Sequence, residues 1–185
     1  DTAGLILALQ ANYEVNLSPQ TFQTMRRLFS NVGDQFLSED TFYYDSSRDV
    51  DHLIIRPKTL QDNALPSGNA LAAHVHWLFY NYDGDQTQLD HLDQMLLKIA
   101  DQASHYPIHF GYWLQIADLR SQKPFQIALV SEKNSDSLMP FLNLYHRFYL
   151  PNCLIAGKSI SKTGGTFPKM LKDKFPIDGS PAAYI

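Results

Sequence analysis

The sequence predicts a mainly α-helical fold of antiparallel α-hairpins, followed by a small C-terminal β-α-β unit. Apolar residues recur at steps of three and four through most of the first 122 residues, which is the spacing of one face of an α-helix. The links between these runs are short, and short links favour helices that pack as antiparallel neighbours. From residue 123 onward, continuous strand-like runs appear. We therefore expect two parts, 1–122 and 123–185.

Composition excludes several classes of protein. The 185 residues include 44% hydrophobic and 18% charged residues, which is typical of a folded domain. A net charge of −4 and a pI near 5.9 argue against a nucleic-acid-binding protein. Cys153 is the single cysteine, so an internal disulfide is excluded and a reducing, cytoplasmic location is expected. No run is long and apolar enough to predict a membrane span. The chain starts at Asp1 within an apparent helix, so we expect a fragment.

The first half of the sequence predicts two helices and a hairpin. Small apolar residues across 2–13 predict a buried helix, and Ser18 followed by Pro19 predicts the cap and first turn of the next one. That second helix carries a single apolar stripe, formed by Phe22, Met25, Phe29, Val32 and Phe36. Two short β-prone runs, 41–45 and 53–55, flank a turn and predict a small hairpin.

Three more helices are expected before residue 122. One begins at Ser67 and continues to Tyr82, with Leu71, Val75, Leu78 and Tyr82 on one face. The next covers 89–103. Pro107 then ends or restarts the helical pattern, and the run 108–119 continues from it.

The C-terminal part predicts a crossover between two parallel strands. The run 125–130 and the run 153–156 are both strand-like, and a helical stripe at 138–148 separates them. A strand, helix and strand in so short a space predict a right-handed connection with parallel strands. The segment 182–185 predicts a last strand.

The loop 56–70 holds the densest set of polar groups in the sequence. Pro57 and Pro66 restrict the residues before them to extended conformations. Ser67 is placed to cap the following helix, and Gly68 allows a close approach of another backbone or a ligand. Asp62 and Asn63 are typical turn residues. The sequence leaves two interpretations open: a well-capped turn whose polar groups satisfy one another, or the wall of a pocket.

Other motifs predict little chemistry. Seven histidines are present, but His74 and His76 lie on different faces of a helix, and no metal-binding spacing occurs, so no metal or cofactor is predicted. The segment 157–159, Gly-Lys-Ser, resembles the end of a phosphate-binding loop, but Asn152 stands where the first glycine is required, so we reject this motif. Five lysines gather late in the chain, which indicates a solvated surface or, as the alternative, a phosphate-binding site. They are Lys158, Lys162, Lys169, Lys172 and Lys174.

Several segments resemble a known family. In the same order, they are similar to the C-terminal part of the spermatogenesis-associated, thioredoxin-domain-containing proteins. The segments are 43–45, 53–58, 62–70, 148–152 and 177–184. The resemblance implies that 1–122 forms the last hairpins of an (α/α)6 toroid, similar to N-acylglucosamine 2-epimerases and six-hairpin glycosidases. It also implies an N-terminal thioredoxin-like domain outside this sequence.

The resemblance and the loop together suggest a cavity that handles a sugar. Asp62 is the first candidate for proton transfer, and His74 is the second. Tyr44 is expected to stack on the ligand. The remaining candidates for substrate binding are Asp45, Arg56, Asn63, Ser67 and Asn69.

Two other functions fit the same sequence. The chain could be a non-catalytic scaffold or interaction module, with the loop purely structural. It could also be a regulatory partner that docks the thioredoxin-like domain through 123–185. Part of a toroid would leave apolar helix faces bare, which predicts self-association into a homo-oligomer.

Overall fold

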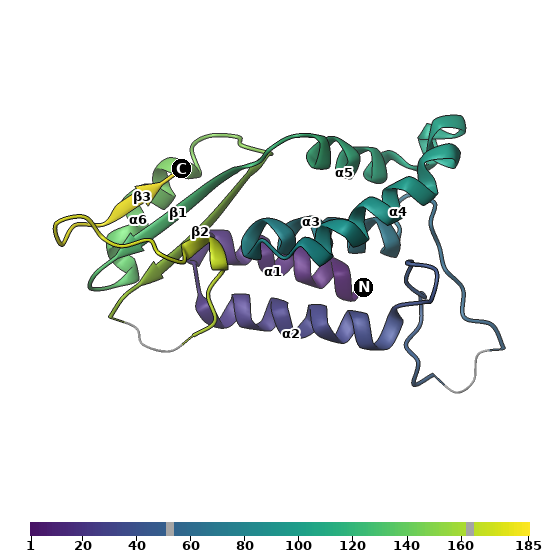
Figure 1. Ribbon diagram of the computed structural model, residues 1–185, viewed down its shortest axis with the longest axis horizontal. Helices are drawn as coiled ribbons and strands as arrows, with labels where there is room; N and C mark the ends of the chain where they lie inside the picture. The colour runs from purple at the N-terminus through teal and green to yellow at the C-terminus, as the bar shows by residue number, and fades with distance from the viewer. Residues whose placement is uncertain (51–53, 162–164) are drawn as a thin grey trace.

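A computed structural model describes residues 1–50, 54–161 and 165–185, and within these ranges the chain is mainly helical with one small sheet. Figure 1 shows helices α1 to α5 gathered at one end of the molecule and the strands at the other, where the C-terminus also lies. The mainly helical class and the small strand-containing C-terminal part are as the sequence predicts.

The long helices begin and end where the sequence provides the local signals. The Ser18 hydroxyl accepts the N–H of Thr21 at the start of α2, and Asp85 accepts the N–H of Thr87 at the start of α4. Gly84 ends α3 in the left-handed conformation, with φ 65°. The helices are α1 (Thr2–Asn16), α2 (Pro19–Phe36), α3 (Gly68–Asp83), α4 (Gln86–His105) and α5 (Gly111–Ser121), with a 3-10 turn, η1 (Pro107–His109), before α5.

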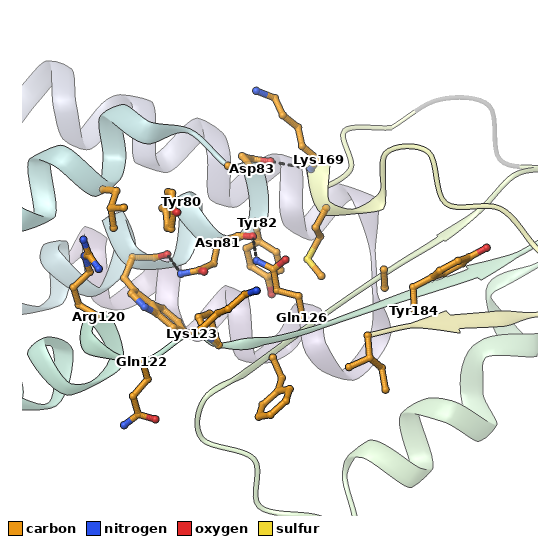
Figure 2. A pocket seen from close by; sticks show the side chains of 18 of the residues that line it. Tyr80, Asn81, Tyr82, Asp83, Arg120, Gln122, Lys123, Gln126, Lys169 and Tyr184 are labelled. Carbon is orange, nitrogen blue, oxygen red and sulfur yellow. Dashed lines mark hydrogen bonds between the residues drawn. The ribbon is translucent and has the colours of Figure 1, made fainter.

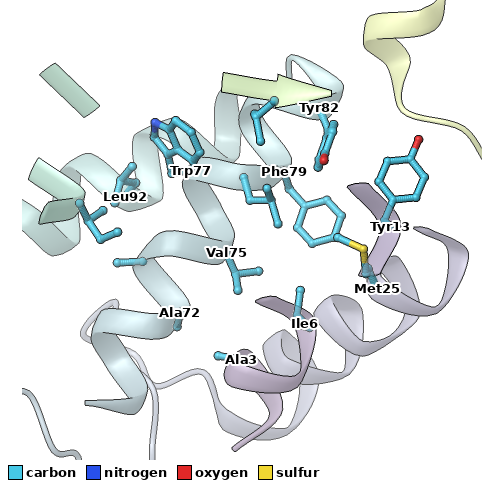
Figure 3. Packing of buried hydrophobic residues seen from close by; sticks show 14 of the residues in the cluster. Ala3, Ile6, Tyr13, Met25, Ala72, Val75, Trp77, Phe79, Tyr82 and Leu92 are labelled. Carbon is cyan, nitrogen blue, oxygen red and sulfur yellow. The ribbon is translucent and has the colours of Figure 1, made fainter. Parts of the chain in front are cut away.

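Helix α3 is the centre of the helical part. It packs against α1, α4 and α5, and most of its residues are buried on all sides rather than along one stripe. Figure 3 shows its apolar side chains meeting those of α1 and α2, with Phe79 directed toward Met25. Small residues, Ala70, Ala72 and Ala73, lie at its start and are themselves buried. The side chains in the first turn of α3 are therefore fixed in position by neighbouring residues on several sides.

The sheet has the predicted parallel pair and one added strand. β1 (Phe125–Ser131) pairs in parallel with β2 (Cys153–Ser159), so that Phe125 lies opposite Cys153, and β3 (Ala182–Tyr184) pairs antiparallel with the other edge of β1. The crossover contains η2 (Ser135–Leu138) and a short helix, α6 (Met139–Tyr145). This helix ends before Phe148, which is exposed, so the predicted stripe is longer than the helix. A further 3-10 turn, η3 (Lys169–Leu171), precedes β3.

The helices and the sheet share a single buried core. The Tyr82 hydroxyl donates to the carbonyl of Ile155, and the Tyr13 hydroxyl accepts the N–H of Gly157, both at 3.4 Å. The apolar cluster runs without interruption from α1 and α3 into β1 and β2. The strands are consequently fixed against the helical part by packing and by hydrogen bonds.

The predicted hairpin of 41–45 and 53–55 is not formed by the residues that the structure describes. Tyr43 makes only an isolated bridge with Leu37, and 54–55 adopt a bend. Leu53 and the neighbouring 51–52 lie outside the described residues, as do Lys162 and Gly164. The reason is local: the backbone groups of Tyr43 that a strand would pair are taken by a side chain from α3, described below.

Candidate functional site

Within the loop 56–70, the stretch 59–69 is fixed to two helices by the carboxylate of Asp62, and we call this stretch the loop 59–69. Asp62 accepts the N–H of Ser67 through Oδ1 and the N–H of Tyr112 through Oδ2, both at 2.8 Å. Its own N–H donates to the carbonyl of His109 at 2.7 Å. The side chain is buried, and it satisfies donors at the first turn of α5 as well as at the start of α3. Asp62 therefore joins the two helices.

Ser67 makes the predicted cap and also closes the loop. Its hydroxyl accepts the N–H of Ala70 at 3.1 Å and donates to the carbonyl of Leu60 at 3.0 Å. The indole N–H of Trp113, on α5, donates to the same carbonyl at 2.7 Å. The Leu60 carbonyl thus lies at the junction of the loop, α3 and α5.

Asn69 takes the place of a strand partner for Tyr43. Its Oδ1 accepts the N–H of Tyr43 at 2.7 Å, and its Nδ2 donates to the carbonyl of Tyr43 at 2.9 Å and to that of Thr59 at 3.0 Å. Asn69 is only 1% exposed. Because it satisfies both backbone groups of Tyr43, that segment needs no second strand.

Arg56 anchors the start of the loop 56–70 to the segments that contain Gln35 and Ser46. Its guanidinium donates to the carbonyls of Ser46 and Gln35, and it lies over the ring of Tyr44 with 4.1 Å from Cζ to the ring centroid. The ring of Tyr44 is therefore already covered on one face by a cation. A sugar would have to stack on the part of the Tyr44 ring that Arg56 leaves uncovered.

A cavity of about 490 Å³ lies beside this loop. Its wall includes five of the eight predicted site residues, namely Tyr44, Asp45, Asn63, Ser67 and Asn69. Asp45 is exposed, and its carboxylate accepts the N–H and the hydroxyl of Thr59 at 3.1 and 2.7 Å. Asn63 is also exposed. Asp45 and Asn63 can therefore reach a bound molecule, whereas Ser67 and Asn69 are mostly occupied with backbone groups.

His74 lies apart from that cavity. Its Nδ1 is 2.7 Å from the hydroxyl of Tyr112, and burial lowers its pKa to about 4. The imidazole is consequently neutral near pH 7 and pairs with a phenol of α5. Asp62 and His74 both contact Tyr112, but neither lines the cavity beside the loop.

Sequence reasoning missed a cluster of aromatic and imidazole groups on the opposite side of α3. The Nε2 of His76 lies 2.6 Å from the hydroxyl of Tyr43, and its Nδ1 lies 2.8 Å from Oε1 of Gln88. The ring of His91 stacks on that of His76, with centroids 4.2 Å apart. Burial is the main cause that lowers both pKa values, that of His76 to about 3. No sequence motif indicates this cluster, because Tyr43, His76 and the pair Gln88 and His91 come from three separate segments of the chain.

Metal chemistry receives no support from the described residues, since none of their His, Cys, Asp and Glu side chains gather in groups of three.

The polar groups of the loop mostly bond to backbone, so the arrangement is rigid. Chemically, the cavity beside the loop offers carboxylate, amide and phenol groups for hydrogen bonding. The carboxylate of Asp62 already receives two backbone donors.

Comparisons with known proteins add no constraint: no family model matches the chain, and no curated protein sequence shows significant similarity to it. The described helices also include none that combines the length and apolar character needed to cross a bilayer.

Proposed function

We propose that the cavity beside the loop 59–69 binds a polyhydroxylated ligand of the amino-sugar class. The observation that carries the proposal is the character of its wall. Among the described residues that line it, Asp45 contributes an exposed carboxylate and Asn63 an exposed amide, and lysine and arginine are not represented. Carboxylates and amides accept hydrogen bonds from hydroxyls, and a carboxylate also attracts a protonated amine.

The size and rigidity of the cavity support a small ligand. A volume of about 490 Å³ falls within the usual range for small-molecule sites. Asp62, Ser67 and Asn69 hold the wall through buried hydrogen bonds, so little conformational entropy is lost when a ligand binds. In this proposal these three residues shape the site, and Asp45 and Asn63 contact the ligand.

The wider setting is also a proposal. We place the helical part in an (α/α)6 toroid built from antiparallel hairpins, because α1 packs on α2 and α3 packs on α4 across short links. The toroid belongs to a cytoplasmic protein with an N-terminal thioredoxin-like domain. We assign sugar binding to this chain but no proton transfer, since both oxygens of Asp62 accept backbone N–H groups.

A non-catalytic interaction module is the second candidate. Exposed apolar side chains on α4, η1 and α5 favour it: Leu97 is 78% exposed, Ile108 is 87% exposed and Leu114 is 45% exposed. Such a surface suits either the thioredoxin-like domain or a second copy of the chain. Light scattering across a concentration series tests self-association, which predicts a mass above that of the monomer.

Thermal shift with glucosamine and N-acetylglucosamine tests the sugar proposal. We expect either sugar to raise the melting temperature of the wild-type chain, and the increase to be lost in a double variant, Asp45→Asn with Asn63→Ala. A larger response to glucosamine than to N-acetylglucosamine would assign a contact between the amine and the Asp45 carboxylate. No response to any amino sugar would favour the interaction module.

A further inference from the structure

A second cavity lies between the helices and the sheet. It has a volume of about 1010 Å³ and opens where the end of α3, the end of α5, the start of β1 and the turn η3 meet. Figure 2 shows Lys123 extending across its middle beside Gln126, with Arg120 on the helical side and Lys169 at the η3 rim. None of the residues proposed above for sugar binding lines it.

The charge of this cleft is opposite to that of the chain. Four cationic side chains line it, Arg120, Lys123, Lys169 and Lys174, whereas Asp83 is the one carboxylate side chain among its described lining residues. The whole chain has a net charge of −4. A concave surface lined by charges of one sign raises the local concentration of counter-ions, so the cleft attracts anions.

Three of the four cationic side chains form no close ion pair with the described residues. Arg120 pairs with Asp93 at 2.7 Å, and Asp83 pairs with Arg26 at 2.5 Å. The ion pairs found among the described residues do not include Lys123, Lys169 or Lys174. Like charges held at one cleft repel each other, and a bound anion relieves that repulsion.

Other contacts place these lysines at the cleft. The backbone N–H of Lys169 donates to Oδ1 of Asp83 at 3.0 Å, which holds η3 against the end of α3. The Nζ of Lys174 lies 5.0 Å from the ring centroid of Tyr184, on β3. Lys123 precedes β1, which is fixed between β2 and β3. The three lysines therefore come from three places in the chain: the link before β1, the turn η3, and the segment between η3 and β3.

Aromatic groups line the same cleft. Tyr80 is half-buried and Phe125 is 67% exposed, and Figure 2 shows Tyr184 on the side of the cleft away from Arg120. Exposed rings beside cations are suited to a ligand that carries both a planar group and negative charge. The volume, about 1010 Å³, is at the upper end of the range for small-molecule sites.

We propose that this cleft binds a small molecule that carries phosphate groups, with Lys123, Lys169 and Lys174 as the phosphate contacts. Lysine acts as a compact positive charge toward phosphate, and three lysines match a ligand with two or more phosphates. The late lysines thus divide by position: Lys169 and Lys174 line the cleft, while Lys172 is exposed and does not. This proposal is independent of the sugar site.

Isothermal titration calorimetry with tripolyphosphate and with ATP tests the proposal. We expect both to bind the wild-type chain, ATP more tightly because its base adds contact with the aromatic rings. Binding should weaken strongly in 1 M salt, where the Debye length is about 3 Å. The same titrations with glucosamine as competitor should be unchanged, because the sugar cavity has a different lining.

A matched pair of double variants locates the site. Lys123→Gln with Lys174→Gln should weaken tripolyphosphate binding about tenfold, the combined effect of two partly exposed charge contacts. Lys133→Gln with Lys172→Gln removes the same charge from exposed positions outside the cleft and should leave binding unchanged. Unliganded melting temperatures confirm that both variants fold.

Three results would overturn the proposal. The first is no heat with either phosphate compound at low salt. The second is an equal loss of binding in the two double variants, which would show attraction by overall charge alone. The third is tighter binding of a single-stranded oligonucleotide than of ATP, which would assign the cleft to a nucleic acid instead.

Discussion

Asp62, the first candidate for proton transfer in the sequence, makes hydrogen bonds that hold two helices together. Its carboxylate accepts two backbone N–H groups that begin different helices, and it is buried. An Asp62→Asn variant can satisfy only one of these donors, because the amide Nδ2 is itself a donor. We predict a loss of about 2 kcal/mol in the free energy of unfolding, measured by urea denaturation. Asp34→Asn, at an exposed position of α2, is the control and should change stability by less than about 0.5 kcal/mol.

Glu14 gives a prediction with a defined pH dependence. Burial raises the pKa of this carboxyl to about 7, against an ordinary value of 4.5. Between these two values the folded state holds the proton more tightly than the unfolded state, so Glu14 lowers stability as the pH rises through that window. Gln10 donates to its Oε1, a bond that glutamine can also accept. We predict that Glu14→Gln raises the urea midpoint more at pH 8 than at pH 5. An equal change at both values would show that Glu14 is ionised in the folded protein throughout.

The serine caps of the helices are the local feature that the sequence predicts best. Serine precedes both α2 and α3, but only Ser67 also donates to a loop carbonyl. We predict that Ser67→Ala lowers the free energy of unfolding by about 1–2 kcal/mol, and that Ser18→Ala, with a longer bond in a more exposed position, lowers it by about 0.5 kcal/mol. Thermal or urea unfolding of the two variants measures the difference. Equal losses would mean that the Ser67–Leu60 bond contributes nothing.

Periodicity predicted the helices better than the site. The stripe of α2 has Phe22, Met25 and Val32 buried as expected, because i, i+3 and i+4 spacing alone specifies one face. Ile108 was expected to continue such a stripe but is exposed in η1, since Pro107 limits that turn. Spacing describes neighbours along a helix and carries no information on contacts between distant segments.

The loop shows the same limit. Its polar composition and the Ser67 cap were predictable, and five of the eight predicted site residues, three of them in the loop, line one cavity. The bonds from Asn69 to Tyr43 and from Asp62 to Tyr112 join residues 26 and 50 positions apart. Such side chain-to-backbone bonds leave no periodic pattern, so the hairpin was predicted where Asn69 replaces it. The cluster of Tyr43, His76 and His91 was not predicted either, because it too joins side chains from distant segments.

For the whole molecule, the packing of α1 against the sheet depends on a glycine. A Cβ built at Gly157 would lie 2.4 Å from Cδ1 of Leu17 and 3.2 Å from Cδ1 of Leu138, and both leucines are buried. We predict that Gly157→Ala lowers the free energy of unfolding by about 1–3 kcal/mol. Gly33→Ala, inside α2 with open space around it, should instead raise it by about 0.5–1 kcal/mol. Chemical denaturation checks both signs, and a neutral Gly157→Ala would mean that the sheet can move away from α1.

The walls of the two cavities carry opposite charges. The wall beside the loop carries the exposed carboxylate of Asp45, whereas the cleft at the sheet carries four cationic side chains. Electrostatic attraction falls off over about 8 Å at physiological ionic strength, so each wall selects its own class of ligand. This difference in charge is the basis of the two proposals, an amino sugar at the loop and a phosphate compound at the sheet.

The most direct test is the affinity of glucosamine for the wild-type chain and for Asp45→Asn, measured by calorimetry near pH 7. We expect the wild type to bind and the variant to bind at least about tenfold more weakly, because a charge-assisted hydrogen bond is lost. Asp136→Asn, an exposed change outside the cavity, should bind as the wild type does. Equal affinity in the wild type and Asp45→Asn, or no binding by the wild type, would contradict a sugar site beside the loop.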